Sequence, residues 1–273
     1  MIRKNVELLE PRYLSAWRKI SLGTWKPIGD SQVYCELQVD AESVLKKIDE
    51  LNKVSLHKIT ITHLMGKVMG KVLKEVPDLN AVVRLGKIYP RKNVDVFFQV
   101  SHDSTELSGH VVRNIDSKSL QEISRELSGT AKEIRAGNDA NFKKMKNSWK
   151  LIPGWLAWLV LDVIGFISYS LNLNIKGLGV PRDTFGSMMI TNVGSLGFSS
   201  AFVPLLPYTY GTFILAMGRA EYRPYCEEDG TVKSRKQLSL CFTFDHRVMD
   251  GAQGAKMVKV LKRYFENPEL LEN

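Results

Sequence analysis

The chain has 273 residues and a net charge of +9 at neutral pH, with 44% hydrophobic and 25% charged residues. This composition is ordinary for a globular protein that buries a sizeable core, as one large α/β domain or as two small ones. Because the lysines are spread over helical faces and accompany no aromatic nucleic-acid motif, we expect no nucleic-acid partner. The positive charge is then either a solvated surface or an attraction to a phosphorylated ligand, an acidic protein or an anionic membrane.

The three cysteines, Cys35, Cys226 and Cys241, are widely spaced along the chain. Their odd number and the lack of paired metal-ligand spacing favour reduced thiols without a bound metal. Residues 1–27 also lack the apolar core of a signal peptide. We therefore expect a cytoplasmic protein.

Alternation of apolar and polar residues predicts a set of short strands. The pattern is clear at residues 31–40, where every second side chain is apolar. Helices lie between some of these strands, without the regular alternation of a doubly wound parallel sheet. Further strands are predicted at residues 81–85, 94–100, 109–112, 187–191, 212–217 and 237–244.

Helical spacing of apolar residues predicts the other elements. Residues 41–53 and 60–76 carry this spacing, and Pro77 ends the second segment. A charged amphipathic helix is predicted at residues 117–136, with Ser117 as its N-cap and Gly137 as its stop. A last helix, at residues 252–265, follows the final strand.

An apolar stretch at residues 155–173 interrupts this pattern, and Asp162 is its only charged side chain. The run is apolar around the whole helix, and its length is near the minimum for spanning a bilayer. Aromatic residues with flanking lysines equally suit a helix that lies in a membrane interface. Burial against the same protein or a neighbouring subunit is the third explanation. The lysines ahead of the stretch are Lys143, Lys144, Lys146 and Lys150, and the aromatics are Trp149, Trp155, Trp158 and Tyr169.

The octet Phe-Asp-His-Arg-Val-Met-Asp-Gly at residues 244–251 carries the chemistry of the chain. It places His246 at the end of a predicted strand, four residues before Asp250 and directly before a predicted helix. A histidine on a rigid strand end suits a general base, because its unperturbed pKa lies near working pH. By spacing alone, a catalytic and a structural role for His246 both stay open.

The octet resembles the His-x-x-x-Asp-Gly signature of the acyltransferase subunits of 2-oxo acid dehydrogenase complexes and of chloramphenicol acetyltransferase. Its fuller form, Asp-His-Arg-x-x-Asp-Gly-Ala, is typical of the dihydrolipoamide acyltransferases. The resemblance extends in order from about Arg18 to the end of the chain, with one interruption. Further matching segments are Val-Val-Arg-Asn-Ile-Asp at 111–116, Ile-Thr-Asn-Val-Gly-Ser-Leu-Gly at 190–197, and the closing helix with its Pro-containing tail at 261–271.

This resemblance implies an α/β fold of the chloramphenicol acetyltransferase-like class, a two-layer sandwich with a large mixed sheet. Residues 1–273 would form a single catalytic domain with a hydrophobic helical insertion at about 141–179. Active sites of this family lie between adjacent subunits, so a homotrimer or a multiple of three is implied. If the insertion crossed a membrane, the N- and C-terminal halves of one sheet would lie on opposite sides of it, which the implied fold forbids. The insertion is therefore expected to be covered by protein or to lie on a membrane surface, which would make the protein peripherally membrane-associated.

The resemblance also assigns roles to single residues. His246 matches the histidine that takes the proton from the thiol of CoA or dihydrolipoamide. Thr191 matches the hydroxyl residue that donates to the oxyanion. Asp250 belongs to the same catalytic set, but its four-residue spacing from His246 favours a helix cap or a pair with a cation over a triad. Its counterpart in the family fixes local structure through an arginine, which Arg18 or Arg247 could supply here as a structural salt bridge.

Three further residues are assigned to substrate binding. Asn192 and Gly194 follow Thr191, where the Asn192 amide either contacts the substrate or holds a turn before Gly194. Gly251 is expected to allow a tight backbone path at the start of the last helix.

The implied function is transfer of an acyl group from a thioester, acyl-CoA, to a thiol or another small acceptor, with CoA as co-substrate and no bound metal. No Asp-Lys pair exists in the chain, so it carries no lipoyl group of its own. Acyl transfer would then have to use a free thiol, or a lipoyl or other carrier domain on another chain. Departures from the family pattern at residues 101–109 and 208–211 leave the acyl group and the acceptor open. The alternative is a non-catalytic scaffold or a membrane-surface subunit of an acyltransferase complex.

Overall fold

The computed structural model of the chain describes residues 3–11, 31–102, 106–135, 153, 156–174 and 182–272. Its strands and helices occur in mixed order, as the sequence predicts. The strands are β1 (Arg3–Lys4), β2 (Gln32–Asp40), β3 (Ala81–Arg84), β4 (Lys87–Pro90), β5 (Val96–His102), β6 (Glu106–Val112), β7 (Leu173–Asn174), β8 (Met188–Asn192), β9 (Phe213–Met217), β10 (Glu221–Cys226) and β11 (Val232–Asp245). The helices are α2 (Glu42–Val54), α3 (Ile61–Glu75), α4 (Leu120–Arg135), α6 (Ala157–Gly165) and α7 (Gly251–Glu266).

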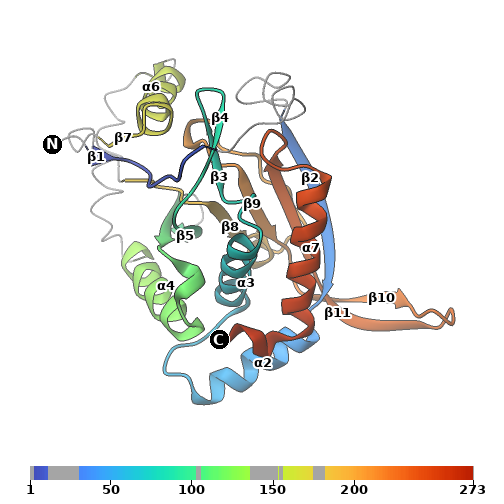
Figure 1. The fold of residues 1–273 in the computed structure, drawn as a ribbon. Helices are drawn as coiled ribbons and strands as arrows, with labels where there is room; N and C mark the ends of the chain where they lie inside the picture. Colours follow the sequence, from blue (N-terminus) through green and yellow to red (C-terminus); the bar gives the residue numbers. More distant parts are fainter. Residues whose placement is uncertain are drawn as a thin grey trace.

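A large mixed sheet organises the described residues. Six of its seven strands follow the order β10-β11-β9-β8-β5-β6, and the seventh, β2, pairs with β11 on the edge opposite β9. Strand β8 runs parallel to both β5 and β9, whereas β11 runs antiparallel to its three neighbours. Helices α2, α3, α4 and α7 form a layer over one face of this sheet (Figure 1). The predicted mixed sheet with a helical layer is confirmed.

The two faces of the sheet have different partners. On β9, Phe213, Leu215 and Met217 belong to the main core, which contains the buried residues of the four helices. The intervening residues Ile214 and Ala216 pack on the opposite face, against coil residues between 201 and 206. This separation follows from the two-residue period of a strand. Coil residues between 201 and 206 therefore cover part of the face that the helices leave open.

The predicted N-cap of α4 is wrong by two residues. Ser117 lies in a short 3₁₀ turn, and α4 begins at Leu120. Ser119 provides the cap: its hydroxyl accepts from the N–H of Glu122 at 3.2 Å, and the Glu122 carboxylate accepts from the N–H of Ser119 at 2.8 Å. This reciprocal pair is a capping box, which the Ser-x-x-Glu spacing encodes. Gly137, the predicted stop, lies outside the described residues.

Two hairpins were not predicted as such. Strand β4 pairs with β3 through a turn in which Leu85 and Gly86 have positive φ angles. Strand β10 and the first half of β11 form an arm that extends away from the helical layer (Figure 1). Its residues are intermediate or exposed, so the arm has no apolar face against the core and no alternating signal in the sequence.

The apolar stretch forms α6, which continues as a π-helix over Phe166–Ser170. Its inner side packs on residues of the same chain. A Cβ added at Gly165 would lie 2.5 Å from the carbonyl oxygen of Tyr208, so only glycine allows this close approach. The ring of Tyr169 stacks on that of Tyr210 at 5.6 Å. The burial of this side agrees with the expectation that protein covers part of the stretch.

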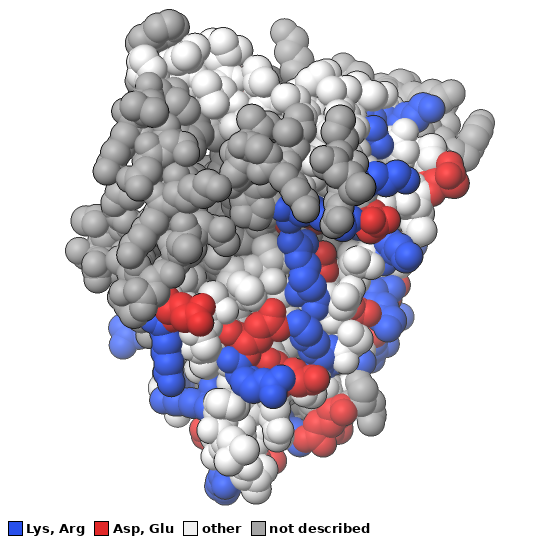
Figure 2. Space-filling model, turned by 90° about the vertical axis from the view of Figure 1, so that its left-hand side faces the viewer, with Lys and Arg blue, Asp and Glu red and all other residues white. Residues whose placement is uncertain are grey.

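The outer side of the same segment is exposed. Trp158, Leu159, Val163 and Phe166 are each more than two fifths exposed. In Figure 2, side chains of both charges intermingle over the lower part of this face of the molecule, and uncharged described residues lie at its top, at the height of α6 in Figure 1. No helix in the described part of the chain is both long and apolar enough to cross a membrane.

Candidate active site

The loop that carries His246 is held at several points. The N–H of His246 donates to the carbonyl of Ser31 at 2.7 Å, and the N–H of Asp245 donates to the carbonyl of Thr212 at 2.9 Å. Val248 and Met249 follow, both buried, and their N–H groups donate to the carbonyl of Asp245. The backbone at His246 is thus fixed on both sides, as a general base requires.

Asp245 and Arg247 form an ion pair on either side of His246. Arg247 Nε lies 3.0 Å from both carboxylate oxygens of Asp245, and Nη2 lies 2.6 Å from Oδ2. The Asp245 side chain is only 4% exposed and that of Arg247 is 13% exposed. This charge-assisted pair neutralises both groups and stiffens the loop.

Asp250 caps the helix that follows. Its carboxylate accepts from the N–H of Ala252 at 3.0 Å, and the Gln253 side chain accepts from the N–H of Asp250 at 3.1 Å. The predicted helix cap is therefore observed. Arg18, the predicted partner of Asp250, lies outside the described residues. A Cβ added at Gly251 would meet nothing within 4 Å, so the tight backbone path expected at that glycine is not found.

Thr191 is the penultimate residue of β8, which leads into a tight turn. Thr191 is 8% exposed. The amide oxygen of Asn192 accepts from the N–H of Ser195 at 3.1 Å, and its amide nitrogen donates to the hydroxyl of Thr62 at 3.0 Å. Gly194 touches the neighbouring chain segment: an added Cβ would lie 2.4 Å from the carbonyl oxygen of Gly218. Asn192 and Gly194 thus build the turn that fixes the end of β8.

The register of the sheet places His246 and Thr191 far apart within one chain. Thr191 is level with Ala216 on β9, and Ala216 is level with Cys241 on β11. His246 follows Cys241 by five residues, which corresponds to about 17 Å at about 3.3 Å per residue. The imidazole of His246 and the hydroxyl of Thr191 therefore cannot both contact one thioester carbon within a single chain.

A cavity of about 340 Å³ lies beside the His246 loop. Asp245 and Arg247 line it, as does Ser31, which accepts the hydrogen bond from His246. The rest of its wall comes from four distant segments: the start of β2, the β3–β4 hairpin, residues 205–212 and the end of the apolar stretch. The apolar wall residues are Val83, Leu85, Phe166, Leu205, Leu206 and Pro207.

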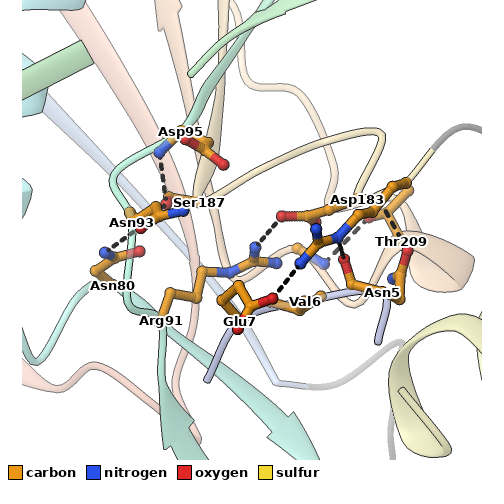
Figure 3. Close-up of polar contacts among 12 residues, drawn as sticks. Asn5, Val6, Glu7, Asn80, Arg91, Asn93, Asp95, Asp183, Ser187 and Thr209 are labelled. Carbon is orange, nitrogen blue, oxygen red and sulfur yellow. Dashed lines mark hydrogen bonds and ion pairs between the residues drawn. The ribbon is translucent and has the colours of Figure 1, made fainter. Parts of the chain in front are cut away.

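A second cavity, also of about 340 Å³, lies beneath the N-terminal segment and is polar. Arg91 Nη1 contacts Asp183 Oδ2 at 2.7 Å, and Arg182 Nη2 contacts Glu7 Oε1 at 2.7 Å (Figure 3). Asp183 also accepts, through its carbonyl, from Arg113 at 3.0 Å. Sequence reasoning missed this cluster. Only Arg113 stood in a motif, and no local signal pairs Arg91 with a residue 92 positions away.

Two other histidines, His63 and His110, make structural contacts. His63 Nδ1 accepts from the N–H of Thr60 at 3.2 Å and completes a capping box at the start of α3. Burial lowers the pKa of His63 to about 4, so the ring is neutral near pH 7. His110 Nε2 lies 2.9 Å from a carboxylate oxygen of Glu126. The described residues contain no group of three or more His, Cys, Asp or Glu placed to hold a metal ion.

Known proteins resemble the chain over the segments that contain these motifs. The family model of the 2-oxoacid dehydrogenases acyltransferase (catalytic domain) matches residues 30–157 and 181–272. A dihydrolipoyllysine-residue acetyltransferase component of the pyruvate dehydrogenase complex from Neurospora crassa is 28% identical over 220 residues, which cover 79% of this chain and 39% of that protein. Other relatives are named as succinyltransferase components and as a lipoamide acyltransferase component of a branched-chain α-keto acid dehydrogenase complex. The chain spans about two fifths of the length of these curated relatives.

Solved structures show the same fold at lower identity. The cubic core of the pyruvate dehydrogenase multienzyme complex superposes with a TM-score of 0.65 at 20% identity, covering 94% of this chain and 88% of the other. A chloramphenicol acetyltransferase superposes with a TM-score of 0.53 at 13% identity, covering 91% and 94%. These likenesses confirm the predicted fold class.

Proposed function

The chain belongs to the family of 2-oxoacid dehydrogenase acyltransferase catalytic domains, and from this premise we propose that it transfers an acyl group from a thioester to a thiol or another small acceptor. The proposed donor is acyl-CoA, with CoA as co-substrate and no resident metal. The observation that carries the proposal is the rigid placement of His246 on the loop between β11 and α7, within the octet that resembles the family signature.

In the proposed reaction His246 acts as general base. It takes the proton from the acceptor thiol, and the thiolate attacks the thioester carbonyl. The carbon–oxygen double bond becomes an oxyanion, to which the hydroxyl of Thr191 donates. The intermediate collapses, the CoA thiolate leaves, and the imidazolium returns the proton to it. Asp250 acts as a positioning residue through its cap on α7, and Asn192 and Gly194 hold the turn that presents Thr191.

The distance between the two catalytic candidates requires a second copy of the chain. Because His246 and Thr191 lie at opposite ends of the sheet, the base of one subunit would meet the hydroxyl of its neighbour. We propose a homotrimer or a multiple of three, since this arrangement closes head to tail. The similar structure of a cubic pyruvate dehydrogenase core supports threefold symmetry, because a cubic assembly contains threefold axes.

We further propose that residues 1–273 are one catalytic domain with an insertion at about 141–179. The family model leaves residues 158–180 unmatched between its two matched segments, which supports this division. An acyl carrier, lipoyl or other, would come from another chain. We place the protein in the cytoplasm. The exposed residues Trp158, Leu159 and Val163 support an additional contact of α6 with a membrane surface.

A mixing experiment tests both the residues and the shared site. His246→Ala should lower acyl transfer by about a hundredfold or more, and Thr191→Val should cost about 2–4 kcal/mol of transition-state stabilisation. When the two inactive proteins are unfolded and refolded together, a shared site predicts recovery of about a quarter of the wild-type rate, because that fraction of interfaces joins an intact His246 to an intact Thr191.

The control is each variant refolded alone, which should stay inactive. Two folded variants with wild-type turnover would remove His246 and Thr191 from the mechanism. Inactive variants that show no recovery on mixing would place the whole site within one chain, against the observed register.

A further inference from the structure

The cavity beside His246 has a wall that comes from the insertion. Phe166 and Ser170 line it, and both lie among the residues that the family model leaves unmatched. The hydroxyl of Ser170 donates to that of Tyr210 at 2.9 Å, and the Arg84 guanidinium donates to the Ser170 carbonyl at 3.0 Å. The insertion is thus fastened to the β3–β4 hairpin and to residues 208–211, where the sequence also departs from the family pattern. The insertion and residues 208–211, two places where the sequence departs from the family, therefore line the same cavity.

The two charged side chains that line the cavity neutralise each other. Arg247 is the cation among its lining residues, and it is paired in bidentate fashion with Asp245, another lining residue. The remaining polar groups at the wall are neutral. An ionised ligand would lose its hydration on entering and would meet a guanidinium already neutralised by a carboxylate. A neutral hydrocarbon group meets no such cost.

The size of the cavity exceeds that of a two-carbon acyl group. A water molecule occupies about 30 Å³ in the liquid, so 340 Å³ corresponds to about eleven water volumes. The apolar wall residues would exclude water from a hydrocarbon chain placed there. Each buried methylene then raises affinity about fourfold.

We propose that this cavity binds the acyl group of the thioester as a neutral hydrocarbon chain or ring larger than acetyl, and that the insertion sets this preference. The inference rests on the proposed acyl transfer and deepens it, because it names the substrate class. The cavity lies next to the backbone of His246, since this residue stands between two lining residues, Asp245 and Arg247, and its N–H donates to a third, Ser31.

Substrate comparison with two variants at Phe166 tests the proposal. The wild-type kcat/KM should rise by about tenfold or more from acetyl-CoA to hexanoyl-CoA, and pentanoyl-CoA should exceed the similarly sized but charged succinyl-CoA by about tenfold. Phe166→Ala should lower the hexanoyl-to-acetyl ratio about fivefold. Phe166→Lys should raise the succinyl-to-pentanoyl ratio, because it adds a cation that Asp245 does not neutralise. Phe166 is 46% exposed, so both variants should fold.

The matched controls are Val163→Ala and Val163→Lys. Val163 lies on the same helical segment, is 49% exposed and does not line the cavity, so its variants should keep the wild-type ratios. Equal ratios for all acyl groups in the wild type, or the same changes from Val163 as from Phe166, would overturn the proposal. A change in KM for dihydrolipoamide alone would also overturn it, because the cavity would then hold the chain of the acceptor.

A binding measurement separates this proposal from the proposed function. Calorimetry with unreactive thioether analogues of acetyl-CoA and hexanoyl-CoA should give tighter binding of the longer chain, and Phe166→Ala should reduce the difference. This result without any His246-dependent transfer would reject the function and keep the binding site. Transfer without any dependence on chain length, in rate or in binding, would keep the function and reject the site.

Discussion

Two cavities in the described part of the chain have the same volume, about 340 Å³, and opposite chemistry. Around the polar cavity, Arg91, Arg113 and Arg182 are bonded to the acidic residues and backbone carbonyls of segments that are remote in sequence. Around the apolar cavity, the Asp245–Arg247 pair is local, and the other walls are mostly hydrocarbon.

The two cavities differ in what their walls do. The charged groups of one hold chain segments together, and the hydrocarbon wall of the other leaves a surface for a ligand. At the polar cavity the N-terminal segment meets residues 91–95, between β4 and β5, and residues 182–183, so its charged groups hold these chain segments together. The apolar cavity leaves hydrocarbon surface next to the candidate base, where a ligand can cover it. In this molecule the concentrated charged residues hold chain segments together, and the cavity proposed to bind the acyl group is the one with few charges.

Arg91→Met should have the largest effect on stability. The Arg91 side chain is 4% exposed and that of Asp183 is 7% exposed, so the substitution leaves a buried carboxylate without its nearest cation. We expect a loss of about 3–5 kcal/mol in the free energy of unfolding, measured by urea denaturation. The control is Arg182→Met at the solvent-facing end of the same cavity. Its pair with Glu7 is 46% and 48% exposed, and its loss should cost about 1 kcal/mol or less.

Similar losses in Arg91→Met and Arg182→Met would show that burial does not distinguish the two ends of the polar cavity. Urea slopes should be compared as well as midpoints. A changed slope would mean that the denatured or native state had altered its compactness.

Tyr210→Phe should have a smaller effect, at the apolar cavity. It removes the acceptor of the Ser170 hydroxyl but keeps the ring that stacks on Tyr169. Loss of this hydrogen bond should cost about 1 kcal/mol. Because the bond fastens the insertion to the cavity wall, hydrogen exchange should accelerate first in residues 156–174. Tyr222→Phe, at a residue 69% exposed, is the control, and equal acceleration there would contradict the role of Tyr210.

Lowering the pH should reduce the contribution of the polar cavity to the free energy of unfolding. This is the smallest of the predicted effects. The hydrogen bond and charge of Arg182 hold the pKa of Glu7 below its ordinary value of 4.5. The unfolded state then binds more protons, so the contribution of Glu7 is complete above pH 4.5 and is lost as the pH falls through the folded pKa. Because Glu7 is solvent-facing, this contribution is a few tenths of a kcal/mol.

The measurement compares Glu7→Gln with the wild type at about pH 6 and about pH 3. The stability difference between the two proteins should shrink at the lower pH, because protonation of folded Glu7 removes its charge interaction with Arg182. A difference that stayed constant with pH would mean that the Glu7 charge contributes nothing.

Local patterns in the sequence determined much of the fold. The alternation at residues 31–40 gives β2, and the spacing at residues 60–76 gives α3, because one-sided burial imposes its period on the side chains. The octet at residues 244–251 indicated a strand end, a loop and a capped helix. Those are the elements that hold Asp245, His246 and Asp250. The arm of β10 and β11 escaped prediction because it packs no apolar face.

The tertiary structure alone decided which distant residues meet. Strand pairing sets Thr191 and His246 at opposite ends of the sheet, which no motif spacing can reveal. The same holds for Arg91 and Asp183, and for the contact of Gly165 in α6 with Tyr208. A side chain's own neighbourhood in sequence reports whether it is buried. Its partner across the fold depends on strand order and register, which are set by the packing of the whole chain.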